Sequence, residues 1–417
     1  MAKLLNWVDD RFPIRKLWNE HLAEYYAPKN FNFWFYFGSL AILIFVLQIF
    51  TGVFLTMHYK PSSEHAFASV EYIMRDVPWG WLLRYMHSVG ASAFFVVIYL
   101  HMFRALLYGS HRAPREFVWL LGCIMYVLLM AESFMGYLLP WGNLSYWGAQ
   151  VIISLFTAIP WIGDGLAEWL RGDFVVSDAT LNRFFAFHVA LIPLVLTMLV
   201  VVHILALHAV GSNNPDGIEI KKNKAANGVP KDGIPFHPYY TVKDLFGAVV
   251  FLIVFLGIVF FSPEFFGLFL ERANFEPANL LQTPSDIVPL WYFTPFYSIL
   301  RAVTYPLFGI DAKFWGVVSM GLSIVLFFFL PWLDRSPVKS IRYRGWMYKT
   351  AVTLFVISFV ILGYLGLKNP QHTDLFLFSN LVWAQIFFFV YFGFFVLMPL
   401  YTKWDKTKPE PDRVTFK

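Results

Sequence analysis

The sequence predicts an all-α, polytopic membrane protein with eight transmembrane helices. Of its 417 residues, 58% are hydrophobic and 14% are charged, and its mean hydropathy is +0.57. Soluble domains are less apolar and more highly charged than this. Eight apolar stretches are each long enough to cross roughly 30 Å of hydrocarbon. They cover residues 33–57, 82–107, 116–138, 184–208, 245–264, 314–333, 347–367 and 378–401.

Charged residues between these stretches predict how the chain is oriented. Basic residues gather at the N-terminus, in segments 104–116, 209–244 and 334–349, and in the C-terminal tail. The intervening loops carry the acidic residues Asp164, Glu168, Asp173, Asp178, Glu264, Glu271, Glu276 and Asp286. Because Lys and Arg are enriched in cytoplasmic loops, we expect both termini to be cytoplasmic.

This orientation divides the chain into five parts. We expect a cytoplasmic segment 1–32, a four-helix core 33–210, a cytoplasmic loop 211–244, a second four-helix region 245–402 and a cytoplasmic tail 403–417.

Two of the predicted helices each carry two histidines about four turns apart. His87 and His101 are 14 residues apart, and His188 and His203 are 15 apart. At about 100° and 1.5 Å per residue, each pair returns to nearly the same helix face about 21–22 Å further along. Imidazole is costly in hydrocarbon unless it is paired or coordinated. Two facing helices of this kind predict two His–His pairs at two depths, suited to two six-coordinate haems. Histidines that only contact neighbouring helices are the alternative.

Glycines on two other predicted helices repeat the same spacing. Gly38 and Gly52 are 14 residues apart, as are Gly122 and Gly136. Glycine allows a flat ring to approach the backbone closely, although ordinary helix packing would also use it. The first four helices are therefore predicted to form a bundle that holds the two haems.

Two arginines flank the first histidine pair. Arg84 lies three residues before His87, and Arg104 lies three residues after His101. A guanidinium at each place would suit a haem propionate. Anchoring of the helix ends at the membrane surface is the alternative.

Composition excludes other kinds of site. The single cysteine, Cys123, allows no disulfide framework or thiolate cluster, and no C-x-x-C-H motif is present for covalent haem attachment. The net charge of +5 is spread over the loops and does not indicate nucleic-acid binding.

Two predicted outer loops are rich in proline and aromatic residues. One begins at Leu139-Pro140-Trp141-Gly142 and continues into an amphipathic stretch near 145–158, and the other contains Pro289-Leu290-Trp291-Tyr292-Phe293. Together they could cover a pocket for an apolar ring-shaped ligand. Interfacial anchoring by Trp and Tyr is the alternative.

Taken together, these residues resemble the cytochrome b family of the bacterial cytochrome bc complexes, the ubiquinol–cytochrome c oxidoreductases. The resemblance covers nearly the whole chain, whose unsplit length favours the bc type over the divided plastid-like type. Its most specific motifs are Arg84–His87, Phe134–Gly142, Leu181–Phe185, Gly211–Pro215 and Ile299–Arg301.

The resemblance implies two b-type haems and two quinone sites. It assigns a low-potential haem near the outer face to His87 and His188, and a high-potential haem near the inner face to His101 and His203. Residues bordering an outer ubiquinol-oxidation site would be Tyr137, Trp141, Tyr292 and Tyr297. An inner quinone-reduction site would be formed by His208, Lys243 and Asp244.

The resemblance also implies a Q cycle and partners. We expect a Rieske iron–sulphur protein, a cytochrome c-type subunit, a homodimeric complex and a location in the bacterial plasma membrane.

Two departures from the family pattern are informative. Leu290 stands where the family's Pro-Glu-Trp-Tyr motif has an acid, whereas Glu132 lies unusually within an apolar helix. We hypothesise that Glu132 replaces the missing proton acceptor, a structural hydrogen bond being the alternative. The His188–His203 spacing is one residue longer than in mitochondrial members, and we expect Pro193 to absorb the difference.

Two other functions are considered. A dihaem membrane anchor of a dehydrogenase would be shorter and would lack the paired quinone-site loops. A proton-coupled transporter would show inverted repeats with broken helices, which the sequence does not.

Overall fold

The apolar stretches form long helices, because a backbone crossing hydrocarbon must satisfy its polar groups internally. The computed structural model describes residues 2–416, and within them seven helices are long and apolar enough to span a membrane. The spans are η2 with α3 (Phe33–Phe35 and Tyr36–Thr56), α5 (Gly80–Tyr108), α6 (Glu116–Leu138), α9 to α10 (Asp178–Val210), α11 (Tyr239–Phe261), α13 (Ala312–Leu333) and α14 (Trp346–Gly366).

The eighth expected span is a bent pair of helices. Helices α15 (Asn380–Val396) and α16 (Met398–Trp404) meet at an angle of 60°. With this pair counted as one span, the expectation of eight membrane helices is confirmed.

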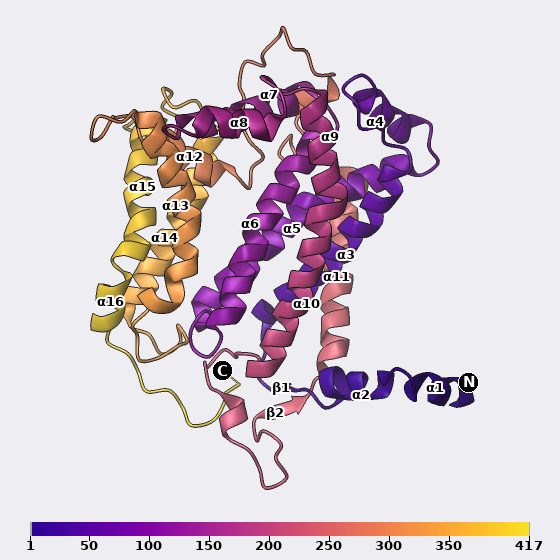
Figure 1. Ribbon diagram of the computed structural model, residues 1–417. Helices are drawn as coiled ribbons and strands as arrows, with labels where there is room; N and C mark the ends of the chain where they lie inside the picture. Colours follow the sequence, from indigo (N-terminus) through magenta and orange to yellow (C-terminus); the bar gives the residue numbers. More distant parts are fainter. Residues whose placement is uncertain (1, 417) are drawn as a thin grey trace.

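Shorter elements lie at the two ends of the spans (Figure 1). Those near the N-terminus are α1 (Ala2–Asp9), α2 (Ile14–Trp18) and η1 (Asn19–Ala23). The opposite end carries α4 (Ala66–Arg75), α7 (Asn143–Ser154), η3 (Phe156–Ala158), α8 (Gly163–Arg171), η6 (Arg272–Phe275) and α12 (Thr294–Ala302). Helix α7 accounts for the amphipathic stretch expected near 145–158. One further short helix, η5 (Ile220–Lys222), lies in the loop before α11.

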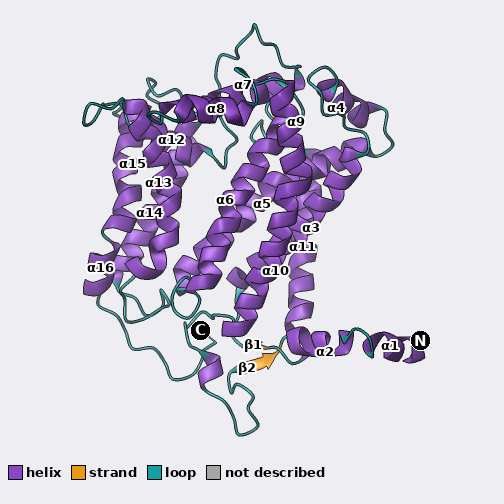
Figure 2. Ribbon diagram, viewed as in Figure 1, coloured by secondary structure: helices purple, strands orange, loops and turns teal. Residues whose placement is uncertain are grey.

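A small sheet departs from the otherwise all-α fold. Strands β1 (Tyr26–Pro28) and β2 (Gly233–Pro235) pair antiparallel, with Tyr26 opposite Pro235. Figure 2 shows the strand pair beside the N-terminal helices. Proline disfavours helix in both segments, and pairing satisfies their backbone groups. The sheet joins the N-terminal segment to the loop before α11.

The spans, together with the short helix α12, form two groups that stand side by side (Figure 1). Helices α3, α5, α6, α10 and α11 pack in one group, and α12 to α15 pack in the other. A shared core joins them, in which Leu106 and Trp119 of the first group pack with Phe327 and Phe355 of the second. Both chain termini lie at the same end of the molecule. We call this the inner end and the opposite one the outer end, following the predicted orientation.

A buried charge cluster holds the inner end of α13. Asp334 follows this helix and pairs with Arg344, while Nε2 of His111 lies 3.1 Å from its carboxylate. All three side chains are fully buried. Burial alone would raise the pKa of Asp334, but the charge of Arg344 and the hydrogen bond from His111 hold it well below its ordinary value. The cluster ties α5 to the loop between α13 and α14.

We expect Asp334→Asn to destabilise the protein strongly. The substitution would leave Arg344 buried without its counter-charge, which typically costs about 3–5 kcal/mol. The midpoint of thermal unfolding of the purified complex should fall markedly. The exposed pair Arg75–Glu71 provides a matched control, because Glu71→Gln should cost less than about 1 kcal/mol. Equal midpoints for the two variants would contradict a stabilising role for the cluster.

Candidate functional site

Two cavities lie at opposite ends of the bundle of α3, α5, α6 and α10. The outer cavity has a volume of about 510 Å³, and its lining includes Phe269–Glu271, Leu290 and Tyr292 of the loop between α11 and α12. The inner cavity has a volume of about 400 Å³, and its lining includes Tyr25 and Phe31 of the N-terminal segment and Tyr240 at the start of α11. The same four helices therefore line a cavity at each of two depths.

The outer cavity contains the first predicted histidine pair. The ring centroids of His87 and His188 are 6.1 Å apart, with the rings nearly perpendicular at 87°. With nitrogen–metal bonds of roughly 2.0–2.1 Å, this separation leaves room for one metal atom between the rings. Among the side chains that the structure describes, no group of three or more His, Cys, Asp or Glu residues could hold a metal ion. A pair of imidazoles therefore suits haem, whose porphyrin supplies the other four ligands.

Hydrogen bonds orient both outer rings for ligation. Nδ1 of His87 is 2.9 Å from Thr51 Oγ1, which donates its own proton to the Leu47 carbonyl and so accepts from the ring. Nδ1 of His188 is 3.0 Å from both the backbone oxygen and the Oε1 atom of Glu132. With Nδ1 protonated in each ring, Nε2 is left unprotonated and available to a metal.

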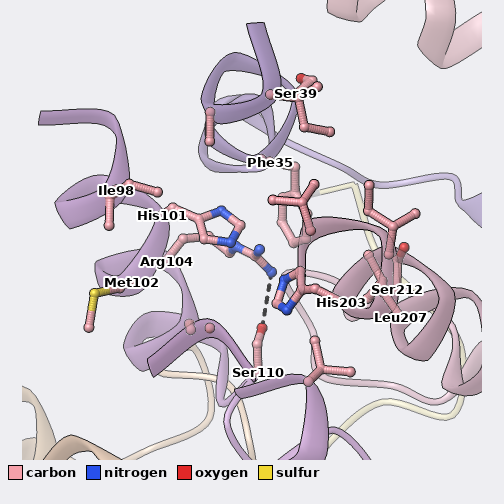
Figure 3. Close-up of a pocket in the computed structure, with 18 of the residues that line it drawn as sticks. Phe35, Ser39, Ile98, His101, Met102, Arg104, Ser110, His203, Leu207 and Ser212 are labelled. Carbon is pink, nitrogen blue, oxygen red and sulfur yellow. Dashed lines mark hydrogen bonds between the residues drawn. The ribbon is translucent and has the colours of Figure 1, made fainter. Parts of the chain in front are cut away.

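The inner cavity contains the second pair, His101 and His203 (Figure 3). Nδ1 of His101 is buried and has no hydrogen-bond partner among the described residues. Arg104 reaches Ser110 Oγ at 3.2 Å, but its Nε is likewise buried and unpartnered there. An unsatisfied guanidinium donor beside a histidine pair suits a carboxylate group of a bound ligand. Arg84 lines the outer cavity in the corresponding place.

Each predicted glycine faces one of the four histidines. A Cβ atom added to Gly136 would lie 2.4 Å from Cε1 of His188, and one added to Gly52 would lie 3.3 Å from that of His87. The corresponding distances are 3.4 Å from Gly38 to His101 and 3.7 Å from Gly122 to His203. Gly136 is thus the most crowded of the four, since a contact below 3.0 Å forces a shift.

A π-helical turn explains the longer spacing on the second histidine helix. The turn η4 covers Phe187–Leu191 and includes His188, directly before α10 (Ile192–Val210). A π turn bonds residue i to i+5 and so takes up one extra residue. The 15 residues from His188 to His203 therefore rotate the chain about as far as 14 residues of regular α-helix. The adjustment lies at His188 itself and comes before Pro193, which was expected to absorb it.

The outer cavity also contains a polar cluster that the sequence reading missed. Tyr137 donates to Glu271 Oε2 at 3.2 Å, and Asn274 donates to the Tyr137 oxygen at 2.7 Å. Burial raises the pKa of Glu271 to about 7. Leu290 lines the same cavity and supplies no acid. The sequence signal for this cluster is Glu271 itself, an acidic residue in a predicted outer loop that is rich in aromatic residues.

Two of the four aromatic residues expected at the outer site border the cavity, and two do not. Tyr137 and Tyr292 line it, with Tyr292 bonded through its hydroxyl to Ser133 at 2.5 Å. Trp141 is instead 5% exposed within a separate apolar core. The ring of Tyr297 packs against Arg301, 4.5 Å from its guanidinium carbon. Trp141 and Tyr297 are therefore not among the residues that line this cavity, and their place at an outer quinol site stays a prediction.

The expected inner quinone-site residues lie together. His208, Lys243 and Asp244 all line the inner cavity. Tyr25, from the N-terminal segment, stacks on His208 with ring centroids 4.2 Å apart, a contact that the sequence reading did not include. Imidazole, ammonium and carboxylate groups thus line the same cavity.

The chain is similar to known proteins over nearly its whole length. The family model described as Cytochrome b/b6/petB matches residues 22–211, and that described as Cytochrome b(C-terminal)/b6/petD matches residues 277–392. Cytochrome b of Allochromatium vinosum is 61% identical, covering 99% of this chain and 98% of that protein. Cytochrome b of Rhodospirillum rubrum is 48% identical over 98% and 95% of the two chains.

A solved structure and a fused relative extend the comparison. A chain of the structure titled "Hyperthermophilic respiratory Complex III" is 37% identical with a TM-score of 0.86, covering 96% of this chain and 99% of that one. A Bradyrhizobium diazoefficiens protein named "Cytochrome b/c1" is 42% identical over 99% of this chain but only 56% of its own length. The chain therefore belongs to the cytochrome b family of Complex III, the quinol–cytochrome c oxidoreductases.

Proposed function

We propose that this chain oxidises quinol in the outer cavity, carries one electron across the membrane and reduces quinone in the inner cavity. The observation that carries the proposal is the stacking of two histidine-lined cavities within one bundle, each with ionisable groups at its membrane-surface end. Oxidation of a quinol releases two electrons and two protons. One electron would leave to a partner and the other would cross the bundle, as in a Q cycle.

Each histidine pair would hold one b-type haem. His87 and His188 would bind the outer one, and His101 and His203 the inner one, with Arg84 and Arg104 facing the propionates. When bound, haem supplies one-electron exchange by cycling of its iron between two oxidation states. The protein's part is to fix the rings, exclude water and leave space through the four glycines.

We propose Glu271 as the proton acceptor for quinol. A general base works best with a pKa near the operating pH, and the pKa of Glu271 is raised to about 7. Tyr137 and Asn274 hold its carboxylate at the cavity wall. The earlier hypothesis assigns this role to Glu132, whose Oε1 already lies 3.0 Å from the ring of His188. Because the carboxylate of Glu132 already accepts from the proposed haem ligand, Glu271 is the better candidate for the proton acceptor.

At the inner end we propose proton delivery to the reduced quinone. His208, Lys243 and Asp244 line the inner cavity. A quinone that gains two electrons also takes up two protons, which must come from groups connected to water. Uptake at the inner end and release at the outer end would make the reaction electrogenic.

We propose that the chain works with a Rieske iron–sulphur protein and a cytochrome c-type subunit. Its one cysteine cannot hold an iron–sulphur cluster. The relative named "Cytochrome b/c1" supports a cytochrome c-type partner, because about half of that protein extends beyond the match. A homodimeric complex in the bacterial plasma membrane, with both termini cytoplasmic, completes the proposal. The basic inner loops and the bacterial relatives support this location.

A reduced-minus-oxidised visible spectrum of the purified complex tests the proposal most directly. We expect two low-spin b-type signals, together with quinol-dependent reduction of cytochrome c. A dihaem anchor of a dehydrogenase would show the haems without the second activity. Absence of haem would overturn the proposal.

We expect Gly136→Ala to remove the outer haem selectively. The added methyl group would lie 2.4 Å from His188 and displace its ring. Gly122→Ala is the matched control, because its methyl group would meet His203 at an ordinary 3.7 Å. Haem content and the difference spectrum should show one b-type haem in the first variant and two in the second. Two intact haems in Gly136→Ala would argue against ligation by His188.

We expect Glu271→Gln to slow quinol oxidation by about a hundredfold at neutral pH. The ionised carboxylate is the active base, so the wild-type rate should rise as the pH increases through the Glu271 pKa of about 7. This rise should disappear in the variant. The exposed Glu276, in the same loop, serves as a control through Glu276→Gln. A near wild-type rate in Glu271→Gln and a large loss in Glu132→Gln would instead support Glu132 as the acceptor.

A further inference from the structure

The Nδ1 atoms of the predicted haem ligands have different partners. His188 faces a carboxylate, since its Nδ1 lies 3.0 Å from Oε1 of Glu132. His87 faces the neutral hydroxyl of Thr51 at 2.9 Å. Nδ1 of His101 has no partner among the described residues. Of these rings, only His188 donates toward an acidic side chain.

The position of Glu132 makes this contact unusual. Glu132 lies within the membrane-spanning helix α6 (Glu116–Leu138), and its side chain is only 16% exposed. Its second oxygen, Oε2, is buried without a hydrogen-bond partner in the described part of the chain. A carboxyl group in hydrocarbon is costly. Its main polar contact is with the ring that would bind the outer haem.

The backbone already provides what is needed to orient that ring. The carbonyl oxygen of Glu132 lies 3.0 Å from Nδ1 of His188 and can accept the same proton. A side-chain carboxylate is therefore not required to fix the tautomer or the direction of the ring. What it adds is an acidic group next to the ligand.

We propose that Glu132, acting through His188, lowers the potential of the outer haem relative to the inner one. The inference rests on the proposed function, because it requires haem between His87 and His188. A hydrogen bond from a metal-bound imidazole to a carboxylate increases the electron donation of the ring. Greater donation favours the oxidised iron and lowers the reduction potential.

The arrangement provides a direction for electron transfer. No comparable carboxylate contacts His101 or His203 among the residues described, whereas Arg104 lies in the inner cavity with them. Arg84 occupies the corresponding place in the outer cavity, so the feature that distinguishes the two pairs is the carboxylate beside His188. Its negative character favours the electron at the inner end. The potential difference would therefore arise from side chains of this chain.

Redox titration of the assembled complex, followed in the b-type visible bands, tests the inference. Glu132→Gln keeps an oxygen acceptor of the same shape and removes the acidic group. Hydrogen bonds to charged groups are stronger than neutral ones, and we expect the oxidised-to-reduced ratio of the outer haem to fall about tenfold. For one electron this corresponds to an upward shift of about 59 mV.

Three comparisons separate this role from a structural one. The inner haem of the same variant is an internal control and should keep its potential. Thr51→Val removes a neutral hydrogen bond from His87 and should shift the outer haem less. Glu132→Asp retains the acidic group and should restore part of the lower potential.

The outcomes distinguish failure of this inference from failure of the proposed function. An unchanged outer potential in Glu132→Gln, with both haems present, would overturn the role of Glu132 alone. Fewer than two b-type signals in the wild-type complex would overturn the proposed function. If Glu132→Gln does not assemble, the outer-haem potential of Glu132→Asp decides. Its shorter carboxyl group should weaken the contact with His188 and give a potential above that of the wild type, and an unchanged potential would count against the inference.

Discussion

An imidazole ring in hydrocarbon has to bond a partner, and the structure of the first bundle follows from this constraint. Four such rings lie on α5 and on the helix from Asp178 to Val210. Each contacts a glycine on the facing helices, so that the rings and the cavities can share the same narrow space. The glycines of α3 and α6 therefore leave the space that the rings occupy.

The spans and the histidine pairing were predictable because both depend on periodicity. A stretch of about 20 apolar residues specifies a helix through a membrane, and helical rotation specifies which residues share a face. Glu271 was not predictable in this way, because the loop that places it beside Tyr137 has no regular period. The contact between Tyr297 and Arg301 likewise follows from no regular period in the sequence. Strands β1 and β2 pair across about 200 residues of sequence, which no local pattern encodes.

The two ends of the bundle are closed by different physical means. The outer end is covered by an aromatic loop held by a few neutral hydrogen bonds, such as that from Asn274 to Tyr137. The inner end is tied by ion pairs, in which Arg413 of the C-terminal tail bonds Asp232 and lowers its pKa to about 2. Asn30 and the backbone of Thr415 both donate to Asp216. Charge therefore fixes the segments around the inner cavity, while the outer cover depends mainly on packing.

The π turn at His188 divides the helix into an outer part and an inner part, whose side chains are rotated relative to each other about the helix axis. Because the additional residue is taken up within Phe187–Leu191, the outer part from Asp178 to Ala186 is rotated relative to the inner part by about one residue's worth of turn. Loss of one residue within that turn would restore a plain α-helix without moving His203 relative to α6. The π turn can thus absorb one added or deleted residue locally. His188 and His203 then keep their relative orientation at the two depths, whether 14 or 15 residues separate them.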